Sequence, residues 1–120
     1  MDHRAGKDRR LRRRRQIQRV FADGHRARDR RVTILAAPNG LPCARWGVAV
    51  SKRHGNAVRR NRIKRLCREA LRLSCGELTP GWDYMILPRP NWNFTLGDLR
   101  RSVASLAKRL AAEAQREQPT

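Results

Sequence analysis

The residues best suited to chemistry lie between Val50 and Leu73, where cations gather on one side of an expected helix. Residues 52–72 hold nine Lys and Arg side chains and one acid, Glu69. On a helix over about 57–74, one face carries Asn61, Lys64, Arg65, Arg68 and Arg72, and the broadly opposite face carries Ile63, Leu66, Cys67, Ala70 and Leu71. Like charges one turn apart destabilise a helix by roughly 0.2–0.5 kcal/mol per pair. An unmixed cationic face therefore predicts a polyanionic partner.

Three neighbouring residues favour RNA among the polyanions. Asn56 is expected to cap the helix, and Asn56 and Asn61 add amide donors and acceptors that suit sugars, base edges or ordered water. Gly55 allows a close backbone approach beside the positive end of the helix, which favours phosphate, and it can equally be a turn residue.

The whole chain is strongly basic. Its 120 residues carry 29 Lys and Arg against 10 Asp and Glu, a formal net charge of +19, and 25 of the cations are Arg. Such a charge attracts polyanions at long range, which favours nucleic acid first and an anionic membrane surface second. Guanidinium groups bind phosphate through paired hydrogen bonds and stack on bases, so the Arg bias suits RNA, although a GC-rich genome also favours Arg codons.

Location and metal binding follow from what the sequence lacks. No stretch approaches the roughly 20 apolar residues of a membrane span, and the N-terminus has no apolar signal core, although its Arg-rich start also resembles an organelle transit peptide. Cys43, Cys67 and Cys75 show no paired spacing, and the three His residues are scattered among them. We therefore expect a reducing, cytoplasmic location, no disulfide framework and no metal held by the protein.

The acids are equally dispersed, which bears on catalysis. A protein hydrolase needs an acid–base pair or a metal cage, and no two acids share a predicted helix face or strand in a way that would bind Mg²⁺ in a pocket. His54 lies among cations, where it has little tendency to act as a base. The sequence predicts that the chain performs no chemistry alone.

The elements that position these residues predict one small α+β domain. Helices are expected over 11–23, with Ile17, Val20 and Phe21 on one face, over 57–74, and from Leu96 to about Ala114 behind a Thr95–Asp98 capping box. Strands are expected over 31–37, 45–51 and 82–87. The order describes a small α/β sandwich over 11–114, after a disordered basic arm (1–10) and before a frayed tail (115–120).

One expected strand has two unlike faces. Trp46, Val48 and Val50 alternate with Gly47, Ala49 and Ser51, so one face is bulky and the other nearly bare. The bare face fits either a shallow groove or a closely packed helix.

The central region reads Val50-Ser51-Lys52-Arg53, Gly55-Asn56-Ala57-Val58, Arg60-Asn61-Arg62-Ile63-Lys64-Arg65 and Arg68-Glu69. In this order and spacing it resembles the signature of the bacterial ribonuclease P protein family. The resemblance covers about residues 11–112 and is weaker outside the central third, where it rests on Val20, Phe21 and Gly24 upstream and on the last strand and helix.

The resemblance implies a fold and two binding surfaces. The family's sheet is packed with helices and contains a left-handed βαβ crossover, against the usual right-handed rule, in a fold also found in a small-subunit ribosomal protein and in elongation factor G. The middle helix is expected to face the catalytic RNA. The RNA-binding residues carried over are Lys52, Arg53, Asn56, Arg60, Asn61, Arg62, Lys64, Arg65, Arg68 and Arg72.

The second implied surface is a cleft between the first helix and the open sheet face, which holds the single-stranded 5′ leader of precursor tRNA. It would involve Ile17, Phe21 and Leu35, positions at which the family often has aromatic residues. This chain keeps only Phe21, so leader contacts are expected to depend more on charge and apolar packing. Ile17 fits the core better than the cleft.

By resemblance, the chain is a subunit of an endoribonuclease that removes the 5′ leader from precursor tRNA. The RNA subunit and its Mg²⁺ perform the hydrolysis, and one protein bound to one RNA improves substrate affinity and metal use. Three alternatives fit the charge: a structural or ribosomal RNA-binding protein, a DNA-binding regulator and a stand-alone protein nuclease. The first does not explain the Gly-Asn-Ala-Val-x-Arg-Asn-Arg run, the second predicts duplex preference, and the third predicts cleavage without RNA.

Overall fold

The computed structural model describes residues 9–91 and 93–117. Three α-helices, α1 (Arg14–Asp23), α2 (Ala57–Leu73) and α3 (Leu96–Glu117), accompany four strands, β1 (His25–Arg28), β2 (Val32–Pro38), β3 (Arg45–Val48) and β4 (Trp82–Pro88). Two short 3₁₀ turns, Lys52–His54 and Cys75–Glu77, flank α2. The predicted α+β class is correct, and most of the predicted basic arm lies outside the described residues.

The strands form one mixed sheet in the order β1-β2-β4-β3. β2 pairs antiparallel with β1 and β4, whereas β3 runs parallel to β4. Because α2 connects these two parallel neighbours, β3–α2–β4 is the βαβ unit that the resemblance implied. Its left-handedness stays a prediction.

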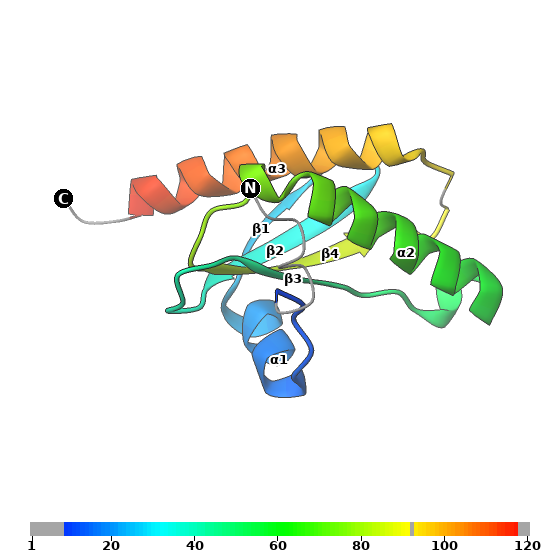
Figure 1. The fold of residues 1–120 in the computed structure, drawn as a ribbon, viewed down its shortest axis with the longest axis horizontal. Helices are drawn as coiled ribbons and strands as arrows, with labels where there is room; N and C mark the ends of the chain where they lie inside the picture. Colours follow the sequence, from blue (N-terminus) through cyan, green and yellow to red (C-terminus); the bar gives the residue numbers. More distant parts are fainter. Residues whose placement is uncertain (1–8, 92, 118–120) are drawn as a thin grey trace.

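The helices divide between the two faces of the sheet (Figure 1). α2 and α3 cover one face, where a core forms from Ile34, Tyr84, Ile86, Ile63, Leu71, Leu99 and Leu106, among others. α1 lies on the opposite face over a smaller cluster of Leu11, Val20, Leu35, Ala37 and Met85. These two clusters fix where the surfaces of α1 and α2 lie.

The sequence prediction missed one strand and displaced several ends. The sequence of β1 is His-Arg-Ala-Arg, and only Ala27 in it is buried, so the apolar pattern is too weak to predict a strand. β1 is a strand because it pairs with β2. α1 begins at Arg14 rather than at Leu11, because residues 9–11 instead pair with Trp46 at the edge of β3. Arg9 and Arg10, the last two residues of the predicted arm, therefore lie beside β3. α3 continues past Ala114 to Glu117.

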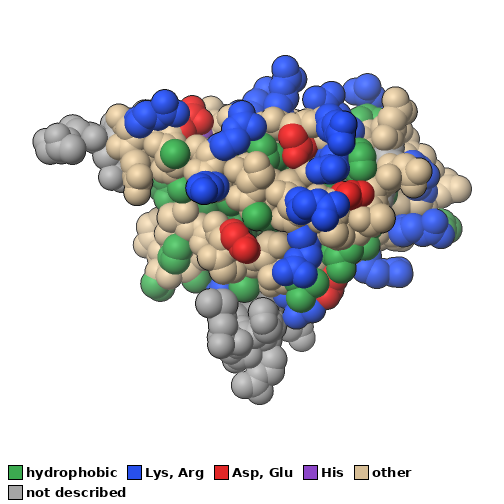
Figure 2. Space-filling model, turned by 90° about the horizontal axis from the view of Figure 1, so that it is seen from above, with side chains coloured by type: hydrophobic (Ala, Val, Ile, Leu, Met, Phe, Trp, Pro, Cys, Tyr) green, Lys and Arg blue, Asp and Glu red, His purple; other side chains and the backbone are tan. Residues whose placement is uncertain are grey.

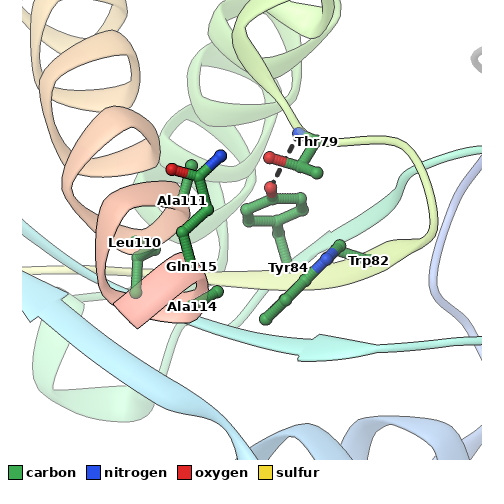
Figure 3. Close-up of a pocket in the computed structure, with 7 residues that line it drawn as sticks. All are labelled: Thr79, Trp82, Tyr84, Leu110, Ala111, Ala114 and Gln115. Atoms are coloured by element: carbon green, nitrogen blue, oxygen red, sulfur yellow. Dashed lines mark hydrogen bonds between the residues drawn. The ribbon is translucent and has the colours of Figure 1, made fainter. Parts of the chain in front are cut away.

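A hollow of about 240 Å³ lies between β4 and the last turns of α3 (Figure 3). Thr79, Trp82 and Tyr84 line one side, and the Tyr84 hydroxyl accepts a hydrogen bond from the Thr79 amide at 2.8 Å. Leu110, Ala111, Ala114 and Gln115 line the other. None of its lining residues belongs to α1 or α2, so it is separate from the two predicted binding surfaces.

Candidate nucleic-acid interface

The start of α2 is built from local hydrogen bonds that the sequence predicted in part. The Asn56 side chain accepts from the Arg59 amide at 2.9 Å, which confirms the predicted cap. Gly55 has φ +113°, a conformation that side chains other than glycine rarely adopt, and an added Cβ would lie 2.7 Å from Arg59 Cδ. The turn role of Gly55 is thus established.

His54 ties this turn to the sheet, a role that the sequence did not reveal. Its side chain is buried, Nε2 lies 2.7 Å from the Pro88 carbonyl oxygen, and Nδ1 lies 3.1 Å from the Ser51 amide. Because an amide can only donate, Nδ1 accepts and Nε2 carries the proton. The ring therefore joins the start of α2 to the end of β4.

The two faces of α2 divide as the sequence predicted. Ile63, Cys67, Ala70 and Leu71 are buried, and Leu66 packs half-buried beside them. Lys52, Arg53, Asn56, Asn61, Arg62, Arg65 and Arg68 are exposed, whereas Arg60, Lys64 and Arg72 are half-buried. All ten predicted RNA-binding residues thus lie on or beside α2 with surface open to solvent.

The charge on this helix is less uniform than predicted at its C-terminal end. Arg72 Nη2 lies 2.5 Å from a Glu69 carboxylate oxygen, and this hydrogen bond lowers the pKa of Glu69. Arg62, Lys64, Arg65 and Arg68, by contrast, make no ion pair or side-chain hydrogen bond with any other described residue. Figure 2 shows Lys and Arg side chains spread over the helical layer, with only isolated acids between them. The surplus cationic charge is therefore on the part of α2 between Arg62 and Arg68.

On the opposite face of the sheet, α1 covers only part of the strands. Arg19 holds it there, because its guanidinium donates to the Pro38 carbonyl oxygen and lies 3.8 Å from the Asp83 carboxylate. Val20 is fully buried, Ile17 is half-buried and Phe21 is 44 % exposed. Leu35 is only 2 % exposed, so it lies in the cluster beneath α1 rather than on an open cleft wall.

A hollow of about 400 Å³ lies at the ends of β3 and β4 and is lined from both sides of the sheet. Ala49 and Leu87, half-buried on the α1 side, line it together with Val48, Arg53 and Lys64. Gly47, in contrast, is packed closely, because a Cβ there would lie 3.2 Å from the Leu11 carbonyl oxygen. The bare strand face is therefore partly covered and partly a groove.

Metal binding and membrane insertion can also be considered from the described residues. In residues 9–91 and 93–117 no three His, Cys, Asp or Glu side chains are grouped so that they could hold a metal ion. None of the described helices is long and apolar enough to cross a membrane.

A family model described as Ribonuclease P matches residues 6–111. The chain belongs to the ribonuclease P protein family. It is 36% identical over 105 residues to the ribonuclease P protein component of Shouchella clausii, with 86% of each chain covered. It is 45% identical over 80 residues to that of Roseiflexus castenholzii, covering 67% of this chain and 66% of the relative.

The fold agrees with solved structures of the ribonuclease P protein family. The Thermotoga maritima ribonuclease P protein superposes with a TM-score of 0.75 at 30% identity, covering 83% of this chain and 96% of that one. Membership gives the chain a role in ribonuclease P and in tRNA processing, with the ribonuclease P RNA as its partner.

Proposed function

We propose that this chain is the RNA-binding subunit that helps the catalytic RNA of ribonuclease P remove the 5′ leader from precursor tRNA. The observation that carries the proposal is the outer surface of α2. There Arg62, Lys64, Arg65 and Arg68 lack counter-charges among the described residues and lie opposite a fully buried apolar face. Such a surface is stabilised when phosphates neutralise it, and Arg binds phosphate through paired hydrogen bonds. The α2 surface is accordingly the contact for the RNA subunit.

The leader binds the groove on the other face of the sheet. Phe21 offers an exposed ring on α1 for stacking, and base stacking contributes roughly 1–3 kcal/mol per base in single-strand binding. Arg53 at the far hollow supplies charge for the leader backbone. Ile17 forms a half-buried wall, and Leu35 supports it from below.

In this division of labour the RNA subunit and its Mg²⁺ hydrolyse the phosphodiester bond. The protein raises substrate affinity and metal use by bringing cations to the RNA subunit and to precursor tRNA. The complex contains one protein and one RNA subunit and lies in the cytoplasm.

Cleavage of precursor tRNA tests the proposal. Ribonuclease P RNA is assayed at low Mg²⁺ with and without the protein, and the protein is also assayed alone. We expect the protein to accelerate cleavage of precursor tRNA by the ribonuclease P RNA and to cleave no precursor tRNA by itself. No acceleration would favour a structural RNA-binding role, and cleavage by the protein alone would favour a stand-alone nuclease.

A further inference from the structure

The segment before α1 is fixed along the outer edge of β3. The Trp46 amide donates to the Arg9 carbonyl oxygen at 2.8 Å, and the Leu11 amide donates to the Trp46 carbonyl oxygen at 2.7 Å. Leu11 is buried in the cluster beneath α1. Arg10 and Arg12 flank Leu11 in the sequence, and both are exposed.

Gly47 makes this close approach possible. A Cβ at this position would lie 2.8 Å from Met85 Sδ and 3.2 Å from the Leu11 carbonyl oxygen. A side chain at this position therefore requires the Met85 side chain to shift and the Leu11 backbone to move by a few tenths of an ångström. Glycine thus allows the segment that carries Arg10 and Arg12 to lie closest to β3.

Arg10 and Arg12 lie across a small hollow from Arg68 of α2. The hollow has a volume of about 140 Å³ and is lined by Arg10, Arg12 and Arg68, with Trp46, Gly47 and Met85 among its other walls. Burial and the charges of Arg10 and Arg12 lower the pKa of Arg68, but an arginine stays charged at neutral pH. Within the described part of the chain, none of these three arginines makes an ion pair or a side-chain hydrogen bond.

Three cations facing one hollow repel one another unless an anion lies between them. The nearest acid along α2, Glu69, is already bonded to Arg72. We infer that Arg10, Arg12 and Arg68 together bind a single phosphodiester group of RNA, between the N-terminal segment and α2. The identity of this RNA rests on the proposed function, and its source is either the RNA subunit or the precursor tRNA leader.

The first experiment tests the site with inorganic phosphate and needs no RNA. Unfolding temperatures are measured for the full chain in phosphate and in chloride at equal ionic strength. We expect phosphate to raise the unfolding temperature of the wild type, and this rise to shrink in Arg12→Ala and Arg68→Ala. Arg100→Ala, an exposed cation on α3 outside the hollow, is the matched control and should keep the full rise. An equal reduction in Arg100→Ala, or none in Arg68→Ala, overturns the inference.

The second experiment asks whether the arginines share one phosphate. The salt dependence of binding is measured separately for the RNA subunit and for precursor tRNA with and without its leader. Each lost phosphate contact lowers the slope by roughly one. If Arg12 and Arg68 share a phosphate, the double variant should lose about one from its slope. This loss should occur with only one of the RNAs, which identifies the source.

A loss of about two in the double variant would mean two separate phosphates and would overturn the shared site. Gly47→Ala provides an independent variant that keeps all three cations. It should reproduce the reduced phosphate response, because it displaces the segment that carries Arg10 and Arg12. A wild type that binds neither RNA would refute the proposed function, whereas the phosphate measurement would still decide the site.

Discussion

The guanidinium of Arg45 binds both carboxylate oxygens of Asp83, with Nε 2.8 Å from Oδ1 and Nη2 2.7 Å from Oδ2. The two residues are register partners on the parallel strands β3 and β4, and Asp83 is fully buried. The hydrogen bond raises the pKa of Arg45. Asn39 and Arg19 approach the same carboxylate from the β2–β3 turn and from α1. One buried acid thus joins the edge strand to the helix that forms the groove.

Asp83→Asn should destabilise the protein strongly, because it leaves Arg45 without its counter-charge. Removing one partner of a buried ion pair costs about 3–5 kcal/mol. The free energy of unfolding in urea measures this loss. Asp23→Asn, at the exposed end of α1, is the matched control and should change it little. A small loss at Asp83 would mean that the pair does not anchor β3.

Arg65→Ala should weaken binding of the ribonuclease P RNA and lower its salt slope by roughly one, because one phosphate contact is lost. The measurement is the dissociation constant over a range of salt concentrations. Arg100→Ala, an exposed cation on α3, should leave the slope unchanged. Equal slopes for wild type and Arg65→Ala would count against α2 as the interface.

Phe21→Ala should weaken binding of precursor tRNA while leaving mature tRNA almost unaffected. Loss of one stacked base corresponds to roughly 1–3 kcal/mol, or about 5- to 150-fold in the dissociation constant. Leu41→Ala is a suitable control, because Leu41 is 41 % exposed, close to the 44 % of Phe21, but lies in the β2–β3 turn. Equal weakening for both tRNAs would place Phe21 outside the leader site.

The sequence predicted α2 well because its determinants are local. The Asn56 cap, the buried stripe around Ile63 and Cys67, and the exposed cations all follow from residues within a few turns of each other. The Thr95–Asp98 capping box is likewise present, with both hydrogen bonds at 3.1 Å. Such features need no knowledge of the rest of the fold.

The features that the sequence did not reveal depend on partners far along the chain. β1 becomes a strand beside β2, and residues 9–11 are placed by hydrogen bonds to Trp46 and by burial of Leu11 beneath α1. Leu35 is buried because α1 packs over it. The sequence predicted that Leu35 lies in a strand, but it could not predict which element covers that face of the strand. For the same reason, the sequence could not show that Arg10 and Arg12 lie near Arg68. The alternation of charged and apolar residues in Arg10-Leu11-Arg12 was nevertheless a signal for an extended segment.

Cys67 should be the slowest thiol to react, because burial raises its pKa to about 12. Thiol reagents attack the thiolate, which is therefore almost absent at Cys67 near neutral pH. Cys43 and Cys75 are half-buried. A colorimetric thiol titration should find two reactive groups in the native protein and a third after denaturation. Cys67→Ala should abolish the slow phase alone, and rapid reaction of all three wild-type thiols would contradict the packing of α2.

Asp29 should make the β1–β2 connection sensitive to acid. Burial acts to raise its pKa, but hydrogen bonds from Ser102 and from the Val32 and Arg31 amides lower it below the ordinary value, helped by the Arg31 charge. A depressed pKa in the folded state contributes stability above the unfolded value of about 3.9, and that stability is lost as the pH falls through the folded value.

Unfolding free energies should therefore fall below about pH 4 in the wild type and fall less steeply in Asp29→Asn, whose side chain cannot ionise. Part of the fall remains in this variant, because the pKa values of Glu69 and Asp98 are lowered as well. If Asp29→Asn instead follows the wild-type curve, the Asp29 carboxylate is not held in its charged form by these hydrogen bonds.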